Sequence, residues 1–324
     1  MKAIVHDRYG SPDVLELRDI PDPVINDEQV LVEVHAASVN ALDYHATRGM
    51  PWLMRLDGSF RKPSIPVRGV DLAGRVVAIG SNVTQFKPGD RVFGSADGSF
   101  AEYAATAPNR LTHMPAGLSY EDGATLNVAG STSLQGLQGR ANLQPGQRVI
   151  INGAGGGVGT MAVQIAKALG AHVTAVTRTE SVELAKAIGA DAVIDHRKED
   201  FTRTRERYDV LFDIGGCFPL TRVRQIVVKN GTVVVAGGPA GRIGPADRLL
   251  AGLLLKPFCS QRIVPFISQN DPVSRAFVGE LAASGKIRPV IERVYPLEQT
   301  ANAVHHVGTG HARGKVVIRV KHAL

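Results

Sequence analysis

Residues 148–177 read RVIINGAGGGVGTMAVQIAKALGAHVTAVT, and this stretch decides the fold. It contains an apolar strand at 148–152, a glycine-rich loop, a helix at 157–169 and a second strand ending near Thr177. Glycines in such a loop let a pyrophosphate approach the backbone, and the helix N-terminus offers free N–H groups to the phosphates. A tight turn without a ligand is the alternative, but the strand–loop–helix–strand context within about 30 residues favours dinucleotide binding. The predicted cofactor contacts in the loop are Gly153, Gly155, Gly156, Gly157, Val158 and Gly159.

The end of the second strand bears on the choice between NAD and NADP. A carboxylate about 20 residues after the glycines would bind the ribose 2′-hydroxyl of NAD. At that distance from Gly159 the chain has Arg178, and Glu180 follows two residues later. Arginine binds phosphate in a bidentate manner, and Thr177 and Thr179 add hydroxyl donors. The sequence therefore predicts NADPH, with NADH less favoured; the alternative is that Thr179 caps a helix in an exposed segment.

Two regions of different pattern divide the chain. Beyond residue 121, apolar β-branched strands at 172–177, 192–194, 208–214 and 232–236 alternate with helices such as 181–188, which predicts a doubly wound parallel sheet. Residues 1–120 show short alternating segments, such as 30–37 and 73–80, and predict a small β-barrel or sandwich with one short helix at 41–49. A helix at 273–284 and strands at 287–294 and 315–320 return to that pattern. The predicted fold class is α/β, with a β-rich domain of residues 1–121 completed by 266–324 and a nucleotide-binding domain of residues 122–265.

Composition excludes several classes of protein. The 324 residues suggest two domains at ~150 residues each. No apolar run approaches the ~20 residues of a transmembrane helix, and acidic residues come too early for a signal peptide, so we expect a cytoplasmic protein without a membrane partner. Two cysteines, Cys217 and Cys259, exclude a disulfide framework. The net charge of +7 fits a phosphorylated cofactor; its densest patch, Arg203, Arg205 and Arg207, is expected to be a solvated loop and not a nucleic-acid contact.

Motifs along the whole chain resemble the medium-chain dehydrogenase/reductase superfamily, in its zinc-free, zeta-crystallin-like branch of quinone oxidoreductases and enone reductases. Besides the glycine loop they are MKA at 1–3, ASVN at 37–40 with Asp43, PGDRVFG at 88–94, GSFAEY at 98–103, GAD at 189–191, FDIGG at 212–216 and HARGKVVI at 311–318. The resemblance implies a GroES-like catalytic domain, closed by the C-terminal segment, and a Rossmann domain. A homodimer that pairs the edge strands of the Rossmann sheets is typical of this family.

The zinc-dependent relatives differ at the positions that would bind metal. They carry a cysteine where this chain has Asn40, and Gly-His-Glu where it has Gly69-Val70-Asp71. Zinc sites favour Cys thiolate and His nitrogen, so neither Asn40 nor Val70 is a suitable ligand. No cysteine precedes residue 217, and the nearby His45 is expected to be structural. We therefore predict no zinc.

The resemblance also implies the site residues. Asn40, Asp43 and Tyr44 are the catalytic candidates: Asn40 donates to a carbonyl or carboxamide, Tyr44 supplies the proton, and Asp43 either takes part in catalysis or holds the loop. The substrate pocket is predicted to include Arg48, Trp52, Phe258, Gln261 and Phe266, although phenylalanine is more often core. Further cofactor contacts are predicted at Thr132, Gly215, Gly237, Gly238, Gly314 and Lys315.

Without a metal, the chemistry favours an electrophile that is already conjugated. Alcohol oxidation needs the alkoxide to be stabilised, whereas an enone, enal or quinone needs the reacting carbon placed and the developing oxyanion hydrogen-bonded. We expect NADPH-dependent hydride transfer to such a small-molecule substrate. Two alternatives are a zinc-independent alcohol dehydrogenase and a weakly catalytic, NADPH-binding interaction protein, which could bind RNA.

Overall fold

The chain forms two compact units in a computed structural model that describes residues 1–50, 52–55, 62–238 and 246–321. Unit 1 comprises Met1–Val128, Asn270–Gly285 and Pro289–Leu324, and unit 2 comprises Ala129–Gln269 and Lys286–Arg288. Unit 1 is therefore built from both ends of the chain. The divisions after Val128 and after Gln269 fall within a few residues of the predicted domain boundaries at 121 and 266. No described helix is long and apolar enough to cross a membrane.

Unit 2 is built on a six-stranded parallel sheet in the order β10-β9-β8-β11-β12-β13. The strands advance from β8 in one direction and from β11 in the other, so the order reverses between these two neighbours. Ligands of open α/β sheets bind at such a reversal, beyond the carboxyl ends of the strands. The strands are β8 (Arg148–Asn152), β9 (His172–Thr177), β10 (Ala192–Asp195), β11 (Tyr208–Asp213), β12 (Val227–Val235) and β13 (Arg262–Pro265).

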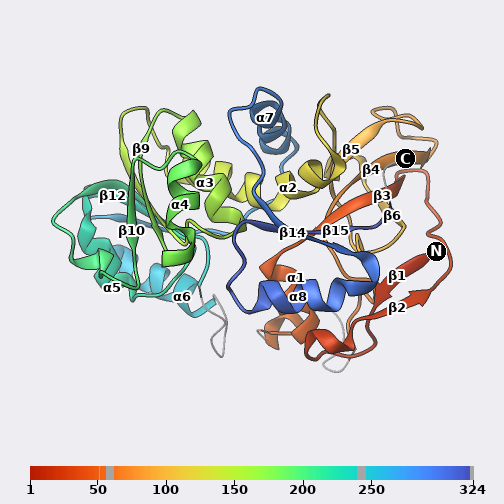
Figure 1. Cartoon of the computed structure of the whole chain (residues 1–324), viewed down its shortest axis with the longest axis horizontal. Coiled ribbons are helices and arrows are strands. Elements are labelled where there is room, and N and C mark those ends of the chain that lie inside the picture. The colour runs from red at the N-terminus through yellow and green to blue at the C-terminus, as the bar shows by residue number, and fades with distance from the viewer. Residues whose placement is uncertain (51, 56–61, 239–245, 322–324) are drawn as a thin grey trace. The chain divides into compact units, whose positions relative to one another are not determined.

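Helices connect the parallel strands, as the alternating pattern predicts. They are α3 (Gly157–Ala168), α4 (Val182–Ala187), α5 (Leu220–Val223) and α6 (Ala246–Leu255). Figure 1 shows α3 and α4 beside strand β9. Continuous apolar strands such as Val149, Ile150 and Ile151 are completely buried because helices cover the sheet on both faces. The α/β class and the Rossmann-like parallel sheet are confirmed.

Unit 1 contains a seven-stranded sheet, mostly antiparallel, in the order β14-β15-β3-β4-β5-β7, with β6 also paired to β3. A separate hairpin pairs β1 with β2. The strands of unit 1 are β1 (Lys2–Val5), β2 (Glu16–Asp19), β3 (Val30–Val39), β4 (Asp71–Ile79), β5 (Arg91–Ser95), β6 (Tyr103–Thr106), β7 (Leu111–His113), β14 (Ile291–Pro296) and β15 (Lys315–Arg319). Because β15 pairs with β3, the C-terminal segment completes the sheet begun by the N-terminal one.

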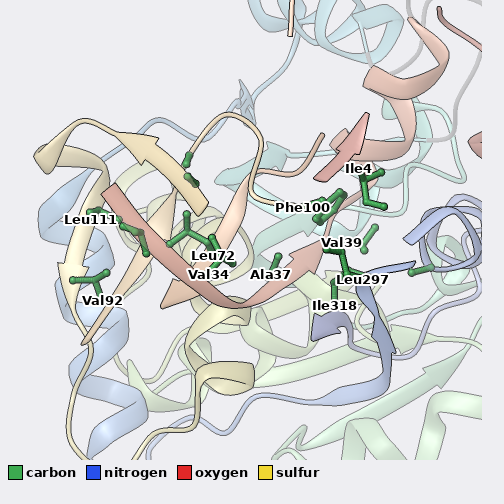
Figure 2. Close-up of a cluster of buried hydrophobic side chains, with 14 of the residues drawn as sticks. Ile4, Val34, Ala37, Val39, Leu72, Val92, Phe100, Leu111, Leu297 and Ile318 are labelled. Carbon is green, nitrogen blue, oxygen red and sulfur yellow. The ribbon is translucent and has the colours of Figure 1, made fainter. Parts of the chain in front are cut away.

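The core of unit 1 follows from the alternation in β3, where Val30, Val32 and Val34 are buried and the residues between them are partly exposed. Figure 2 shows side chains of β3 gathered with Leu72 of β4, with Ile318 of β15 and with Phe100, which lies outside the strands. The helices of unit 1 are α1 (Ala41–Arg48), α7 (Pro272–Ala283), α8 (Thr300–Gly308) and the first part of α2 (Tyr120–Leu134), whose residues after Val128 belong to unit 2. The short helix expected at 41–49 is confirmed as α1, which ends at Gly49 in the left-handed conformation, φ 58°.

Two predicted strands differ from the observed ones. The strand expected at 287–294 begins only at Ile291, because Lys286–Arg288 belong to unit 2. The strand expected at 232–236 starts earlier, at Val227, since Asn230 adopts a positive φ of 66° and carries the chain through an irregular pairing with β11. Strand β12 lies inside the sheet of unit 2. Among the described residues, β13 is the strand at that edge of the sheet.

Candidate active site

The glycine loop of unit 2 joins β8 to α3 in a form that admits only glycine at its tightest points. Gly153 has a φ of +93°. A Cβ atom on Gly159 would lie 2.1 Å from the carbonyl oxygen of Gly153, and one on Gly155 would lie 2.6 Å from Oγ1 of Thr177. Helix α3 begins after Gly156 without a side-chain cap. Its first N–H groups are therefore available to a phosphate, and the loop fits the pyrophosphate of a dinucleotide.

The end of β9 lies next to this loop and has its acidic groups already engaged. Arg178 is partly exposed and directly follows the strand. Glu180 pairs with Arg197 at 2.6 Å, and Asp195 accepts a hydrogen bond from Oγ1 of Thr179 at 2.7 Å, which lowers the pKa of that carboxyl. Thr179 caps no helix, since the capping positions are Arg178 and Ser181.

A buried ion pair, which sequence reasoning missed, lies at the carboxyl ends of β8 and β11. Asp213 is completely buried and pairs with Arg248 of α6. Its Oδ1 also accepts hydrogen bonds from Nδ2 of Asn152, at 2.7 Å, and from the backbone of Gly216, at 3.0 Å. Burial raises the pKa of Asp213, and the Arg248 charge opposes that rise. The pair ties α6 to the sheet where its strand order reverses.

The other residues predicted for unit 2 lie on several elements. Gly215 and Gly237 follow β11 and β12, and a Cβ on Gly237 would lie 2.5 Å from the carbonyl oxygen of Ile214. Gly238 has the Arg248 side chain beside it, and Thr132 is partly exposed on α2.

The three residues of unit 2 that were predicted to line the substrate pocket have separate surroundings. Phe258 is exposed, Gln261 donates to the carbonyl of Val227, and Phe266 is buried under the Arg140 guanidinium.

Asn40 and Asp43 occupy the start of α1 in unit 1. Asn40 precedes the helix, and Oδ2 of Asp43 accepts the Asn40 backbone N–H at 2.7 Å. The Asn40 side chain is held on both sides: its Nδ2 donates to Asp71 at 2.9 Å, and its Oδ1 accepts from Nζ of Lys315 at 2.6 Å. The Asp43 carboxylate therefore anchors the backbone of Asn40, and both polar ends of the Asn40 side chain are engaged in hydrogen bonds.

Asp71 is the centre of this buried network. It is completely buried on β4 and accepts hydrogen bonds from five donors: Ser38 Oγ, Asn40 Nδ2, Asn127 Nδ2, the Val128 backbone and Lys315 Nζ. Lys315, predicted as a cofactor contact, is 3% exposed and directs its ammonium group at Asp71 and Asn40 within unit 1. Sequence reasoning missed the role of Asp71; a carboxylate beginning an apolar strand is the signal that could have found it.

Burial also changes the proton affinity of Asp43. It raises the pKa of this carboxyl to about 7, against the effect of the Asn40 backbone N–H, and nearby Asp71 raises it further. Lys315 and Arg68 lower it. Near neutral pH the Asp43 carboxyl is therefore divided between its protonated and ionised forms.

Tyr44 of helix α1 packs its ring against helix α8. A Cβ atom on Gly308 would lie 2.2 Å from Cε2 of the Tyr44 ring, so glycine is needed for this contact. The Tyr44 hydroxyl accepts a hydrogen bond from Nη1 of Arg48 at 2.8 Å, and Arg48 also lies over the ring. Two other predicted residues of unit 1 lie elsewhere. Trp52 is half-exposed at the start of a short 3₁₀ helix. Gly314 precedes Lys315 and has a positive φ of 85°.

Comparison with known proteins identifies the family. The family described as alcohol dehydrogenase GroES-like domain matches residues 26–116, and that described as zinc-binding dehydrogenase matches residues 188–318. The human protein named quinone oxidoreductase is 31% identical, and the alignment covers 98% of this chain and 97% of that protein. The chain belongs to the medium-chain dehydrogenase/reductase superfamily, in its quinone oxidoreductase branch.

Two further relatives support this membership in the medium-chain superfamily. An Arabidopsis thaliana protein named NADPH-dependent alkenal/one oxidoreductase is 33% identical over 98% of this chain and 79% of its own length. The solved structure of the quinone oxidoreductase from Coxiella burnetii is 30% identical, with a TM-score of 0.89 and coverage of 99% of both chains.

The residues of this medium-chain protein do not fit the zinc that one of its matching families is named for. At the two positions where zinc-dependent relatives carry Cys and His ligands, this chain has the amide of Asn40 and the apolar side chain of Val70. The ammonium group of Lys315 lies 2.6 Å from the Asn40 oxygen and repels a cation there. Within the described ranges, no group of three or more His, Cys, Asp or Glu side chains is arranged for a metal ion.

Proposed function

We propose that this chain is a zinc-independent reductase that transfers hydride from NADPH to a quinone or an activated alkene. The carrying observation is its end-to-end similarity both to proteins named quinone oxidoreductase and to one named NADPH-dependent alkenal/one oxidoreductase. The buried Asn40–Asp71–Lys315 network supports the zinc-independent part, because a fixed ammonium group occupies the place where a metal would need ligands.

The glycine loop and the end of β9 support NADPH as the cofactor. When bound, the nicotinamide supplies the hydride. Residues 153–159 would hold the pyrophosphate, and Arg178 would pair with the 2′-phosphate. The carboxylates of Glu180 and Asp195, which could instead bind a ribose hydroxyl, are held by Arg197 and Thr179. Gly215, Gly237 and Gly238 are partly exposed after β11 and β12 and carry no side chain, so their backbone groups would be accessible to the carboxamide.

On unit 1, Tyr44 is the proposed proton donor and Asn40 the proposed hydrogen-bond donor to the substrate carbonyl. The Tyr44 hydroxyl accepts its hydrogen bond from Arg48, so its own proton remains available for donation to the substrate. Asn40 would have to exchange its bond to Asp71 for one to the substrate. Asp43 acts as a positioning residue through the Asn40 backbone.

A substrate panel tests the proposal. NADPH oxidation is measured with 1,4-benzoquinone, 9,10-phenanthrenequinone, an alkenal and a cyclic enone, and NADP reduction is measured with a simple alcohol. We expect turnover with at least one of the first four substrates and none with the alcohol. Alcohol-dependent reduction alone would establish the alcohol dehydrogenase alternative. Retention on RNA without turnover of any substrate would favour the interaction protein.

We also propose that the chain forms a homodimer through β13. This strand ends the described sheet of unit 2, and an edge strand offers unpaired backbone groups to a second copy. Helix α6 packs on β13 and exposes Leu250, Leu253 and Leu254, at 57%, 58% and 64%, which gives an apolar surface beside the edge. The cytoplasmic location stays a prediction, which microscopy of the tagged protein in its native cell would test.

A further inference from the structure

Unit 1 contains a cavity that borders the proposed catalytic residues at Asp43, while Asn40 and Tyr44 are not in its lining. Its volume is about 240 Å³, and its lining includes Tyr9, Asp43, Arg68, Val70 and Asp97. Leu42, Asp43 and Ala46 place one wall of it along helix α1. Because ligand pockets for drug-sized molecules occupy ~300–1,000 Å³, this cavity suits a compact ligand.

Arg68 is the unusual group in the lining. Burial lowers its pKa, which shows that the surroundings disfavour its charge. Among the described residues its guanidinium makes one hydrogen bond, from Nη2 to the carbonyl oxygen of Ile65 at 2.6 Å, and its Nε is buried without a partner. A half-buried guanidinium with so few acceptors is costly unless an anion compensates it.

The two carboxylates in the cavity do not supply that compensation. Asp97 is held by both terminal nitrogens of Arg110, at 2.9 and 3.0 Å. Asp43 makes no ion pair with Arg68, and its Oδ2 accepts the Asn40 backbone N–H. Both acids attract Arg68 from a distance, but neither bonds to it.

We propose that this cavity binds a small carboxylate, which the guanidinium of Arg68 holds. Arginine presents paired N–H groups that match the two oxygens of a carboxylate. A monoanion is favoured over a dianionic phosphate because Asp43 and Asp97 also line the cavity and repel negative charge. The site lies within unit 1, and binding there does not depend on hydride transfer or on the proposed function.

Asp43 makes the affinity depend on pH. The charged groups that act on it are Asp71 of β4, Lys315 of β15 and Arg68. When Asp43 is ionised, its negative charge opposes a bound carboxylate, and when it is protonated that repulsion is absent. Because burial raises its pKa to about 7, affinity should increase as pH falls from 8 to 6, a range in which the ligand carboxylate itself stays ionised.

The experiment uses benzoate as the probe, benzamide as its neutral counterpart, and isothermal titration of the full chain without cofactor. We expect benzoate to bind the wild type, more tightly at pH 6 than at pH 8, and benzamide not to bind. Arg68→Gln should weaken benzoate binding by roughly tenfold or more, since a charge-assisted bond is lost. Arg75→Gln, a matched change of an exposed arginine on β4, should leave it unchanged.

Two further variants keep the proposal falsifiable. Arg68→Lys retains the charge but not the paired geometry and should give an intermediate affinity, which also serves if Arg68→Gln does not fold. Asp43→Asn should bind benzoate with little dependence on pH. Absence of benzoate binding to the wild type at millimolar concentration, or equal binding to the wild type and the Arg68 variants, would overturn the carboxylate site.

Discussion

At the scale of single residues, Lys315 decides how charge is balanced inside unit 1. Its ammonium group lies 3.4 Å from Asp71, and both side chains are almost fully excluded from water. Removing one partner of a buried pair leaves the other charge uncompensated, which is more harmful than losing an exposed pair. Lys315 therefore serves the stability of the site, in addition to any contact with a ligand.

Lys315→Met should lower the free energy of unfolding by about 3–5 kcal/mol, because Asp71 would remain buried without its cation. Lys321→Met is the matched control, since Lys321 forms an exposed pair with Glu33, and should cost less than about 1 kcal/mol. Urea unfolding of the two variants measures the difference. Equal losses in the two variants would show that the buried pair does not stabilise unit 1.

Asp43 should make stability depend on pH in a direction opposite to an ordinary salt-bridged acid. Its pKa is raised to about 7 in the folded chain, whereas an unfolded Asp titrates near ~3.9. Between these values the folded state binds more protons. The contribution of Asp43 to the free energy of unfolding therefore falls as pH rises from about 4 to about 7, by at most ~1.4 kcal/mol per pH unit.

The measurement is the difference in unfolding free energy between the wild type and Asp43→Asn across pH 4 to 8. Because other groups titrate in both proteins, the difference isolates Asp43. It should move in favour of the variant as pH rises and level off above pH 7. A difference that stays constant with pH would mean that Asp43 is ionised throughout this range.

Arg178 carries the prediction for cofactor choice. Arg178→Ala should weaken NADPH binding by roughly tenfold or more, as expected for a lost charge-assisted bond, and leave NADH binding nearly unchanged. Arg203→Ala, which alters an arginine that is 80% exposed beside Asp200, is the control and should affect neither. Fluorescence titration with both cofactors measures these effects. Equal losses for NADPH and NADH would exclude a role for Arg178 in recognising the 2′-phosphate.

At the scale of elements, the glycine loop could be predicted from the sequence because its signal is local. Strand β8, the loop and helix α3 are consecutive, and the need for glycine arises from contacts among neighbours, such as Gly159 with Gly153. Exact element limits were harder to predict. Asn230 turns the chain inside β12 with a positive φ. The Asn230-Gly231 pair is typical of a turn, so local pattern alone does not predict that one strand continues through it.

Gly159→Ala tests the loop as an element. The added Cβ would lie 2.1 Å from the carbonyl oxygen of Gly153, so the loop and α3 must separate, at a cost of about 1–3 kcal/mol typical of overpacking. We expect lower thermal stability and loss of NADPH binding. Gly139→Ala, where nothing lies within 4 Å of the added atom, should retain both. NADPH binding by Gly159→Ala at wild-type affinity would contradict the role given to the loop.

At the scale of the whole molecule, the sequence could not predict which distant residues meet. Lys315 and Asp71 are 244 residues apart in the chain, and their pairing depends on β15 joining β3 and β4 in one sheet. For the same reason Arg68 carried no signal in the sequence. Resemblance to a family predicted the strand that brings Lys315 back to the N-terminal region, but not the partner of its ammonium group.

The proposed dimer is also a property of the whole molecule. Light scattering should give a mass near twice the 34.5 kDa of one chain. Leu253→Glu should shift the protein toward the monomer, because it places a charge on the apolar surface beside β13. Val24→Glu alters another exposed apolar residue, in unit 1, and should leave the mass unchanged. A monomeric wild type, or a Leu253→Glu variant that stays fully dimeric, would rule out this interface.

We propose above all that the chain reduces a conjugated substrate with NADPH and without zinc. The most direct test measures the zinc content of the purified protein and its NADPH oxidation with 9,10-phenanthrenequinone and a cyclic enone in the same preparation, before and after treatment with a chelator. We expect turnover of at least one substrate that is unchanged by the chelator, with a zinc content far below one ion per chain. Turnover that disappears with the chelator and returns with added zinc would contradict it.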